Sequence, residues 1–364
     1  MKKSITILAA LMTAATMTWA ETTSPPETKE EKDLKYWAEA VASRVKVTGY
    51  AQAGYTATMP EEGPNTNTFD MKRVILMVGA NITPEFYAFF MHDFKSKDMQ
   101  EYYLEYRPSK AFNLRFGQSK IELSMENPMS PTVLESIGPM SQSVFWLCGA
   151  DPLMGNPAGR DLGLMAYGDL FKGKLRYVLE VVNGGQTNTA DRDHRKNVIG
   201  KLEYRPDPRI RASVSGQIGY GCAVKASEYN LTVTEGETYT QNRYAVGMEW
   251  KSKKTGNDYH KNRCAMVRAE VLGGKDGDCG SFGAYVSTAI PVYKGLDFVA
   301  MADYMNYNTD SKIKKTNLMA GLQYWIFKKC RLQAQYTYSL RSDAMKALQG
   351  DNQSIIQTQV QVAF

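Results

Sequence analysis

The last nine residues of this chain alternate between apolar and polar side chains. One face carries Ile356, Thr358, Val360, Val362 and Phe364, while three glutamines and an alanine occupy the other. Because side chains of an extended strand point to alternate faces, this period of two predicts a strand with one mostly apolar and one polar face. The same pattern, with long polar residues on the second face, recurs in residues 174–181, 243–251, 265–271 and 331–341. The fold must therefore cover an apolar face on many strands at once.

Two kinds of fold provide that cover. The apolar faces can pack on one another in a large sandwich or solenoid, or they can face lipid in a membrane barrel whose polar faces line the lumen. No fixed repeat of about 20–50 residues is present, and aromatic residues gather near the strand ends, where the interfacial girdles of a membrane barrel lie. These residues are Tyr55, Phe69, Phe94, Tyr204, Trp250, Tyr324, Trp325 and Phe364. We predict an all-β fold, a transmembrane antiparallel β-barrel.

The first twenty residues have the features of a secretory signal peptide. Lysines at positions 2 and 3 precede an apolar stretch, residues 5–15, that is too short to span a bilayer. Small residues before position 21 suit a cleavage site, and we expect cleavage after Ala20, with Ala14 or Ala15 as alternatives. Export of this kind is consistent with a barrel in the outer membrane of a Gram-negative cell.

The mature chain divides into a short tail and the barrel. Residues 21–43 are expected to form a periplasmic tail, in which helical spacing over 33–43 indicates a short helix and a linker is the alternative. From residue 44 the period changes to two and largely remains so to residue 364. The barrel is therefore predicted to span residues 44–364.

The alternating segments number sixteen. They are 44–58, 69–81, 84–95, 99–107, 111–120, 160–170, 173–183, 196–205, 209–222, 241–253, 261–273, 279–291, 295–307, 313–327, 329–341 and 353–364. An even number puts both chain ends on the periplasmic side, and the connections then divide into short periplasmic turns and longer external loops, as such barrels require. One periplasmic connection, 254–260, is long for a turn, so fourteen or eighteen strands are the alternatives.

Basic residues recur on the polar faces of these strands. Alternation turns the following toward the lumen: Arg73, Arg115, Arg176, Lys201, Arg205, Arg211, Arg243, Arg268, Arg331 and Arg341. A pore lined by fixed cations concentrates anions, because low-dielectric walls focus the electric field. Acidic residues such as Glu180, Glu249 and Glu270 share these faces, so that many of the charges are expected to pair across strands and to stiffen the wall.

The segment Ala111–Lys120 (AFNLRFGQSK), followed by a long loop, resembles a strand of the phosphate-selective porin O and P family of Gram-negative outer membranes. The re-entry motif GRDLG at 159–163, followed by GDL at 168–170, resembles that family too. So do the strand end at Asn183-Gly184, the basic pair in MKRV at 71–74, and Asp93-Phe94. The basic pair begins with Lys72 where the family has arginine.

The resemblance implies a sixteen-stranded homotrimer whose third external loop, residues 121–158, folds into the lumen. It also implies that Lys120 lies at the constriction and that Arg73 belongs to a basic ladder that selects phosphate, with Arg209 and Arg211 as further members. Together with the inward-facing Arg115, Arg176, Arg243 and Arg268, these are the expected pore-lining, anion-binding residues. Lipid and lipopolysaccharide are the expected partners of the outer surface.

We therefore predict a non-enzymatic porin for passive diffusion of small solutes that favours anions such as phosphate. The alternatives are a general porin, a structural or adhesive barrel with a closed lumen, and an outer-membrane phospholipase built on His92 and Ser96. No Gly-x-Ser-x-Gly or HExxH motif and no Cys/His cluster is present, so neither a cofactor nor a metal is expected. A net charge of +6 is too small to indicate a nucleic-acid partner. The five cysteines are interpreted as small apolar filler.

Overall fold

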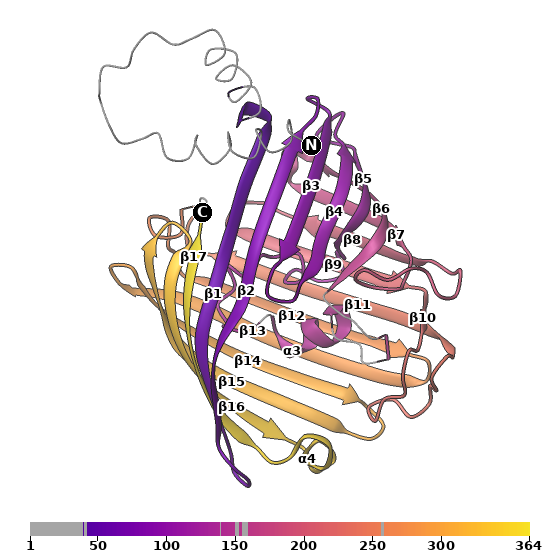
Figure 1. The fold of residues 1–364 in the computed structure, drawn as a ribbon, viewed down its shortest axis with the longest axis vertical. Helices are drawn as coiled ribbons and strands as arrows, with labels where there is room; N and C mark the ends of the chain where they lie inside the picture. The colour runs from indigo at the N-terminus through magenta and orange to yellow at the C-terminus, as the bar shows by residue number, and fades with distance from the viewer. Residues whose placement is uncertain (1–38, 40–41, 139, 150–152, 155–158, 256–257) are drawn as a thin grey trace, which may run out of the picture.

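The computed structural model describes residues 39, 42–138, 140–149, 153–154, 159–255 and 258–364. The predicted signal peptide (1–20) and most of the predicted tail and helix (21–43) lie outside these described residues. The described part of the chain forms a closed β-barrel that holds a short helical segment inside it (Figure 1).

Antiparallel strands run in sequence around the barrel, and β1 closes it by pairing with both β2 and β17. The strands are β1 (Val45–Pro60), β2 (Thr66–Asn81), β3 (Phe86–Asp93), β4 (Asp98–Tyr106), β5 (Asn113–Lys120), β6 (Arg160–Leu170), β7 (Leu175–Val182), β8 (Asn197–Tyr204), β9 (Ile210–Ile218), β10 (Tyr220–Cys222), β11 (Thr238–Lys251), β12 (Met266–Asp276), β13 (Cys279–Tyr293), β14 (Leu296–Asn308), β15 (Ile313–Phe327), β16 (Cys330–Arg341) and β17 (Gln353–Ala363). Closure pairs the backbone groups of the wall with one another, which is what allows strands to span a bilayer.

Strands β9 and β10 form a single span of the barrel. They are separated only at Gly219, and both pair with β11. The barrel therefore has sixteen spans, which confirms the predicted number and excludes fourteen or eighteen.

The predicted alternation of the two faces is confirmed. On β11, Val246 and Met248 are 53% and 51% exposed, whereas Glu249 is 4% exposed and lies inside. The same difference separates exposed Val267 and Val271 from buried Arg268 and Glu270 on β12. The outer surface is consequently apolar, and the long polar side chains point inward.

Aromatic residues lie at both ends of the outer surface, as predicted, with one exception. Tyr55 and Phe69 are in ring contact, with centroids 5.0 Å apart, and Phe364 is exposed at the other end of its strand pair. Trp325 does not belong to a girdle. It is 2% exposed and its Nε1 donates to Asp297 Oδ2 at 2.9 Å inside the barrel. The prediction was wrong because Tyr324 and Trp325 are adjacent on one strand and must point to opposite faces.

The long periplasmic connection between β11 and β12 folds against the inner wall. The ring of Tyr259 stacks on Trp325 at 5.2 Å, and His260 Nδ1 lies 2.7 Å from the Trp325 carbonyl oxygen. Arg263 Nη1 donates to Asp297 Oδ1 at 3.0 Å. These contacts account for the length of this connection without an additional strand.

Helical structure occurs in the connections and also just before β1, where the described residues 39 and 42–44 are helical, at the end of the segment 33–43 in which a short helix was predicted. The helices of the connections are α3 (Gln142–Val144), the π-helix η1 (Phe145–Gly149), the 3-10 turn η2 (Phe171–Gly173) and α4 (Asp343–Gln349). Helix α4 lies in the external loop before β17, where no helix was predicted. Ser342 is its N-cap residue, and its side chain accepts a hydrogen bond from Met345 N. Within the described residues, every helix is too short or too polar to cross a membrane.

Candidate functional site

The loop between β5 and β6 folds into the barrel, as predicted for the third external loop. Its helices α3 and η1 lie within the barrel outline, in front of β12 to β14 (Figure 1). The neck of the loop is closed by Asn127, whose Nδ2 donates to the carbonyl oxygens of Ile121 at 2.7 Å and Gly159 at 2.9 Å. We call residues 121–159 the constriction loop.

One side of the constriction loop packs on the inner wall through apolar side chains. Leu123, Val144 and Leu147 of the loop are fully buried. They belong to one cluster with inward-facing residues of β12 to β15, namely Leu272, Val299, Met301, Met305 and Met319. This apolar patch inside a largely polar lumen fixes the side of the barrel on which the loop lies.

Buried wall carboxylates hold the backbone of the constriction loop. Glu270 accepts hydrogen bonds from Met125 N at 2.7 Å and Glu126 N at 3.3 Å, and Asp303 Oδ2 accepts one from Gln142 N at 2.6 Å. The expectation that inward acids pair mainly across strands is therefore incomplete, because these two acids serve as acceptors for the loop.

Two of the predicted pore-lining arginines also hold the loop. Arg268 Nη1 donates to Glu135 Oε2 at 3.1 Å, and Ser287 Oγ donates to the same oxygen at 3.0 Å. Arg243 Nη1 donates to the carbonyl oxygen of Leu147 at 2.5 Å. In the structure these two guanidinium groups are buried against the loop.

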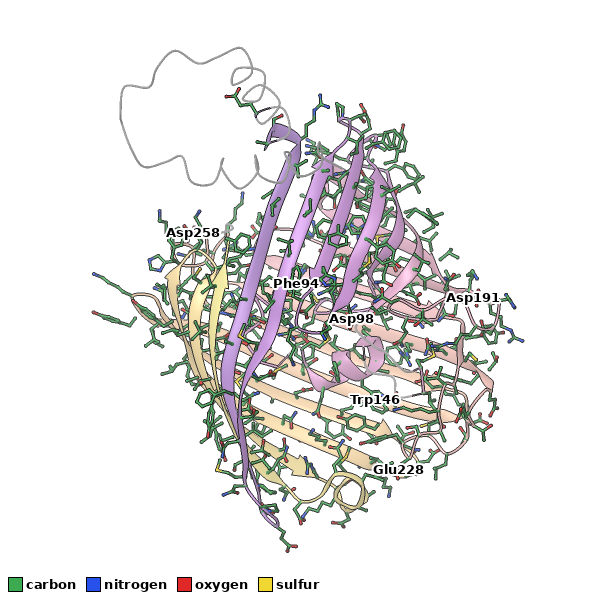
Figure 2. All side chains as sticks on the ribbon, in the orientation of Figure 1. Phe94, Asp98, Trp146, Asp191, Glu228 and Asp258 are labelled. Atoms are coloured by element: carbon green, nitrogen blue, oxygen red, sulfur yellow. The ribbon has the colours of Figure 1, made fainter. Side chains whose placement is uncertain are left out.

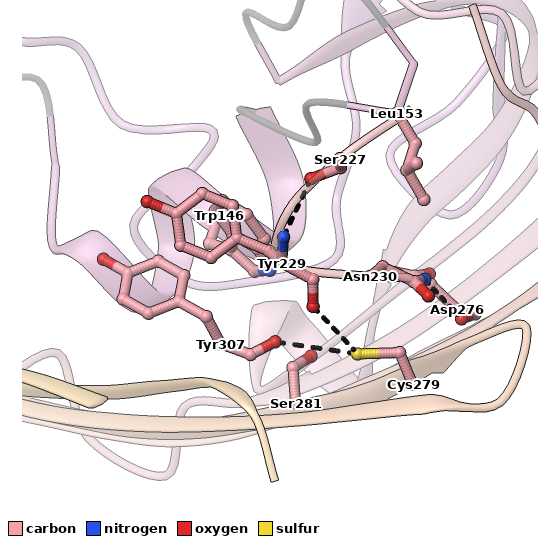
Figure 3. Close-up of a pocket in the computed structure, with 9 residues that line it drawn as sticks. All are labelled: Trp146, Leu153, Ser227, Tyr229, Asn230, Asp276, Cys279, Ser281 and Tyr307. Atoms are coloured by element: carbon pink, nitrogen blue, oxygen red, sulfur yellow. Dashed lines mark hydrogen bonds between the residues drawn. The ribbon is translucent and has the colours of Figure 1, made fainter. Parts of the chain in front are cut away.

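An aromatic cluster covers the constriction loop from the external side. Trp146 lies inside the barrel (Figure 2), and its ring is 4.6 Å from that of Tyr307 and 5.0 Å from that of Tyr229. Tyr229 comes from the external loop before β11, and its carbonyl oxygen accepts a hydrogen bond from Cys279 Sγ at 3.6 Å (Figure 3). The constriction loop is thus held both by the inner wall and by Tyr229 of the external loop before β11.

The opposite side of the constriction loop faces a cavity of about 180 Å³ against β1 to β6. Lys120 and Arg73 both line it, so the structure brings together the residue that the family resemblance placed at the constriction and one that it placed on the basic ladder. Arg160, the register partner of Lys120 on β6, also lines it. The remaining lining residues are Tyr50, Ile75, Met91, Asp93, Gln100, Pro131, Met140, Phe145 and Gly149.

Arg160 was part of a quoted motif but was not predicted as a site residue. Its side chain is 8% exposed, and its Nη2 lies 3.3 Å from Glu101 Oε1. The sequence signal was its position as the first residue of the strand that follows the long loop. Because β5 and β6 are antiparallel, the end of one lies beside the beginning of the other, and this places Arg160 next to Lys120.

The other predicted pore-lining residues lie away from this cavity. Arg115 pairs with Glu105 at 2.7 Å, Arg176 with Asp169 at 4.0 Å, and Arg211 with Glu203 at 3.6 Å and Glu249 at 3.4 Å. The expected ion pairs between neighbouring strands are therefore present from β4 to β11.

Arg209 does not lie in the strand wall. It is half-exposed in the turn before β9 and pairs with Asp207 at 2.8 Å. It was grouped with Arg211 on the assumption that the strand begins at residue 209, whereas β9 begins at Ile210.

The Glu126 carboxyl group of the constriction loop has an altered protonation equilibrium. Burial, assisted by the neighbouring Glu270 carboxylate, raises the pKa of Glu126 from 4.5 to about 7, although Arg268 acts in the opposite direction. Glu126 Oε2 accepts a hydrogen bond from Ser141 N at 3.0 Å, which joins the two arms of the loop.

The described residues contain no cluster of three potential metal ligands and no disulfide bond.

No family model matches the chain, and no curated protein matches it either. The resemblance to the phosphate-selective porin O and P family consequently remains a prediction. Solved structures of outer-membrane porins and channels do match the fold. An anion-selective porin from Comamonas acidovorans superimposes with a TM-score of 0.63 at 14% identity, over 88% of this chain and 99% of that one.

Two further structures extend this comparison. OprB of Pseudomonas putida matches with a TM-score of 0.66 at 10% identity, over 94% of this chain and all of that one. The outer-membrane channel DcaP of Acinetobacter baumannii matches with a TM-score of 0.58 at 12% identity, over 88% and 97% of the two chains. At such identities the likeness defines the fold, which is that of a porin. This fold and the apolar outer surface agree with the predicted place in the Gram-negative outer membrane.

Proposed function

We propose that this porin-fold barrel is a passive diffusion channel of the outer membrane that favours small anions. The observation that carries the proposal is the position of the constriction loop. The loop packs on the β12 to β15 side and leaves open a cavity in which Arg73, Lys120 and Arg160 gather. Cations at the narrowest part of a low-dielectric pore raise the local concentration of anions.

The finer parts of the proposal rest on the family resemblance. Phosphate is one anion that the three cations would accept, and the homotrimer would bury part of the apolar outer surface, with lipid and lipopolysaccharide on the rest. One structural neighbour, OmpT of Vibrio cholerae, is described as a trimer. The inward-facing ion pairs near Arg115 and Arg211 serve as structure in this proposal, because each is neutralised by a carboxylate.

Recording from the purified full chain in a planar bilayer tests the channel. We expect discrete conductance steps, a reversal potential in a salt gradient that favours anions, and a decrease in chloride current when phosphate is added. Folding is checked on the same preparation by the heat-dependent gel mobility of barrels. Folded protein that gives no steps would contradict the channel and favour a closed barrel, whereas a cation-favouring reversal potential would contradict the anion preference alone.

A further inference from the structure

The constriction cavity has two chemically different walls. The barrel side carries Arg73, Lys120 and Arg160 beside an apolar group of Tyr50, Ile75 and Met91, whereas the loop side carries Phe145, Met140 and Pro131. Phe145 is 41% exposed, although Val144 before it and Leu147 after it are fully buried. The loop thus leaves an aromatic ring exposed in the lumen, opposite the cations.

The barrel side of the cavity carries hydrogen-bond donors that are not used within the described residues. Among the described residues, Lys120 Nζ makes one hydrogen bond, to the Met129 carbonyl oxygen at 2.6 Å, and Arg73 donates only from Nη1, to Gln52 Oε1 at 2.8 Å. Tyr50 is 3% exposed and lines the cavity, yet its hydroxyl has no hydrogen-bond partner in the described part of the chain. The hydroxyl oxygen is not one of the fully buried polar atoms that lack a partner, so it is open to the cavity and can donate to a ligand there.

The charge of the cavity suits a single negative charge on the ligand. The carboxylate that lines it, Asp93, already accepts backbone hydrogen bonds at Oδ1 from Val74 at 3.1 Å and Lys95 at 3.0 Å. Glu101 offsets Arg160 through their ion pair. Among the described residues, Arg73 and Lys120 form no ion pair within 4 Å, although the carboxylates of Asp93 and Glu101 lie near enough to act on them electrostatically.

We propose that this cavity binds monocarboxylates that carry an apolar body, such as benzoate or a short fatty acid anion. The carboxylate accepts hydrogen bonds from Arg73, Lys120 and the Tyr50 hydroxyl, and a guanidinium matches its planar geometry. The apolar body lies on Phe145 and Met140. Inorganic phosphate has no apolar part and leaves that wall in contact with water. A volume of about 180 Å³ is below the range of drug-sized pockets and suits so small a ligand.

Calorimetric titration of the folded, detergent-solubilised full chain tests this inference, which rests on the proposed channel function. The probes are benzoate, acetate, inorganic phosphate and benzyl alcohol. Benzoate should bind about tenfold more tightly than acetate, which corresponds to partial burial of one phenyl ring. Benzyl alcohol, which has the ring without the charge, should bind more weakly than benzoate. Equal affinities for benzoate and acetate, or tighter binding of phosphate, would overturn the inference.

Matched variants separate the two walls. Phe145→Ala should reduce the benzoate-to-acetate ratio toward one, and Arg73→Gln should weaken both carboxylates. Leu231→Ala removes an apolar side chain that is 81% exposed in an external loop, and it should leave the ratio unchanged. If Phe145→Ala and Leu231→Ala give the same benzoate-to-acetate affinity ratio, benzoate is binding the micelle or another surface, and the inference fails.

Bilayer recording of the same preparation distinguishes this failure from failure of the channel. Conductance steps that benzoate and acetate block at the same concentration contradict the carboxylate preference and leave the channel intact. Selective benzoate binding by folded protein without conductance steps contradicts the channel and supports the binding site.

Discussion

Arg268 on β12 and Glu135 of the constriction loop form a buried ion pair, with Nη1 3.1 Å from Oε2, across 133 residues of sequence. Arg268 Nε also lies 3.1 Å from Glu249 Oε2 on β11. The backbone carbonyl of Glu135 accepts further hydrogen bonds from Gln333 and Gln335. This group of contacts joins the tip of the loop to the wall at both its side chain and its backbone.

Replacing Glu135 by Ala should release the loop from this wall. Loss of one partner of a buried ion pair typically costs roughly 3–5 kcal/mol, because the other charge stays buried. We expect a lower urea midpoint of unfolding together with a larger and noisier single-channel conductance. Glu62→Ala, in an exposed external loop, is the control and should change neither. Unchanged conductance in Glu135→Ala would show that this pair does not hold the constriction.

Replacing Lys120 by Gln should lower anion selectivity. The amide keeps a donor for the Met129 carbonyl but removes one of the three cations that line the cavity. The reversal potential in a salt gradient should therefore move toward zero, and block of chloride current by phosphate should weaken. Lys294→Gln makes the same charge change in an exposed periplasmic turn and should leave both values as in the wild type. If Lys120→Gln and Lys294→Gln show the same reversal potential and the same phosphate block, Lys120 does not control selectivity.

The stability of the protein should depend on the protonation of Glu126. Because burial raises its pKa from 4.5 to about 7, the folded protein holds the proton more tightly than the unfolded chain does. The resulting stabilisation is complete below about pH 4.5 and is lost as the pH rises through about 7.

Glu126→Gln isolates this contribution, because an amide stays neutral. Between pH 4.5 and 8, the wild type should lose of the order of 3 kcal/mol of unfolding free energy relative to Glu126→Gln. Urea titrations at several pH values measure the difference, with Glu62→Gln as the exposed control. Parallel pH profiles for wild type and Glu126→Gln would contradict the prediction.

Replacing Tyr259 by Ala should widen the periplasmic mouth. Tyr259 stacks on Trp325 and, with Arg263 and Glu135, borders a second cavity of about 70 Å³ below the constriction loop. We expect a higher conductance and a stability loss of about 0.5–1.5 kcal/mol, the usual contribution of an aromatic pair. Tyr293→Ala, which removes an exposed ring, is the control. A conductance equal to that of the control would indicate that the periplasmic connection does not narrow the path.

The strands were predictable because the information that specifies them is local. A two-residue period in a segment such as 243–251 specifies which side chains face outward, whatever its neighbours are, and the structure follows it there. Trp325 shows where a composition-based rule fails. An aromatic residue near a strand end belongs to a girdle only if its side chain faces outward, and that of Trp325 faces inward.

The site was predictable only in part, since the roles of its arginines depend on distant partners. Alternation correctly turned Arg243 and Arg268 inward, but it could not show that the loop covers both of them. Arg160 became a neighbour of Lys120 through antiparallel pairing across the whole loop.

The sequence by itself determined the barrel, its apolar outer face and its polar lumen, because strand period and turn position are properties of short segments; it predicted sixteen spans, and the structure excluded the alternatives of fourteen and eighteen. Only the tertiary structure decided the path of the constriction loop and hence which cations stay open to solute. That choice depends on apolar contacts with β12 to β15 and on carboxylates such as Glu270 and Asp303, which lie more than a hundred residues from the loop atoms that they bind.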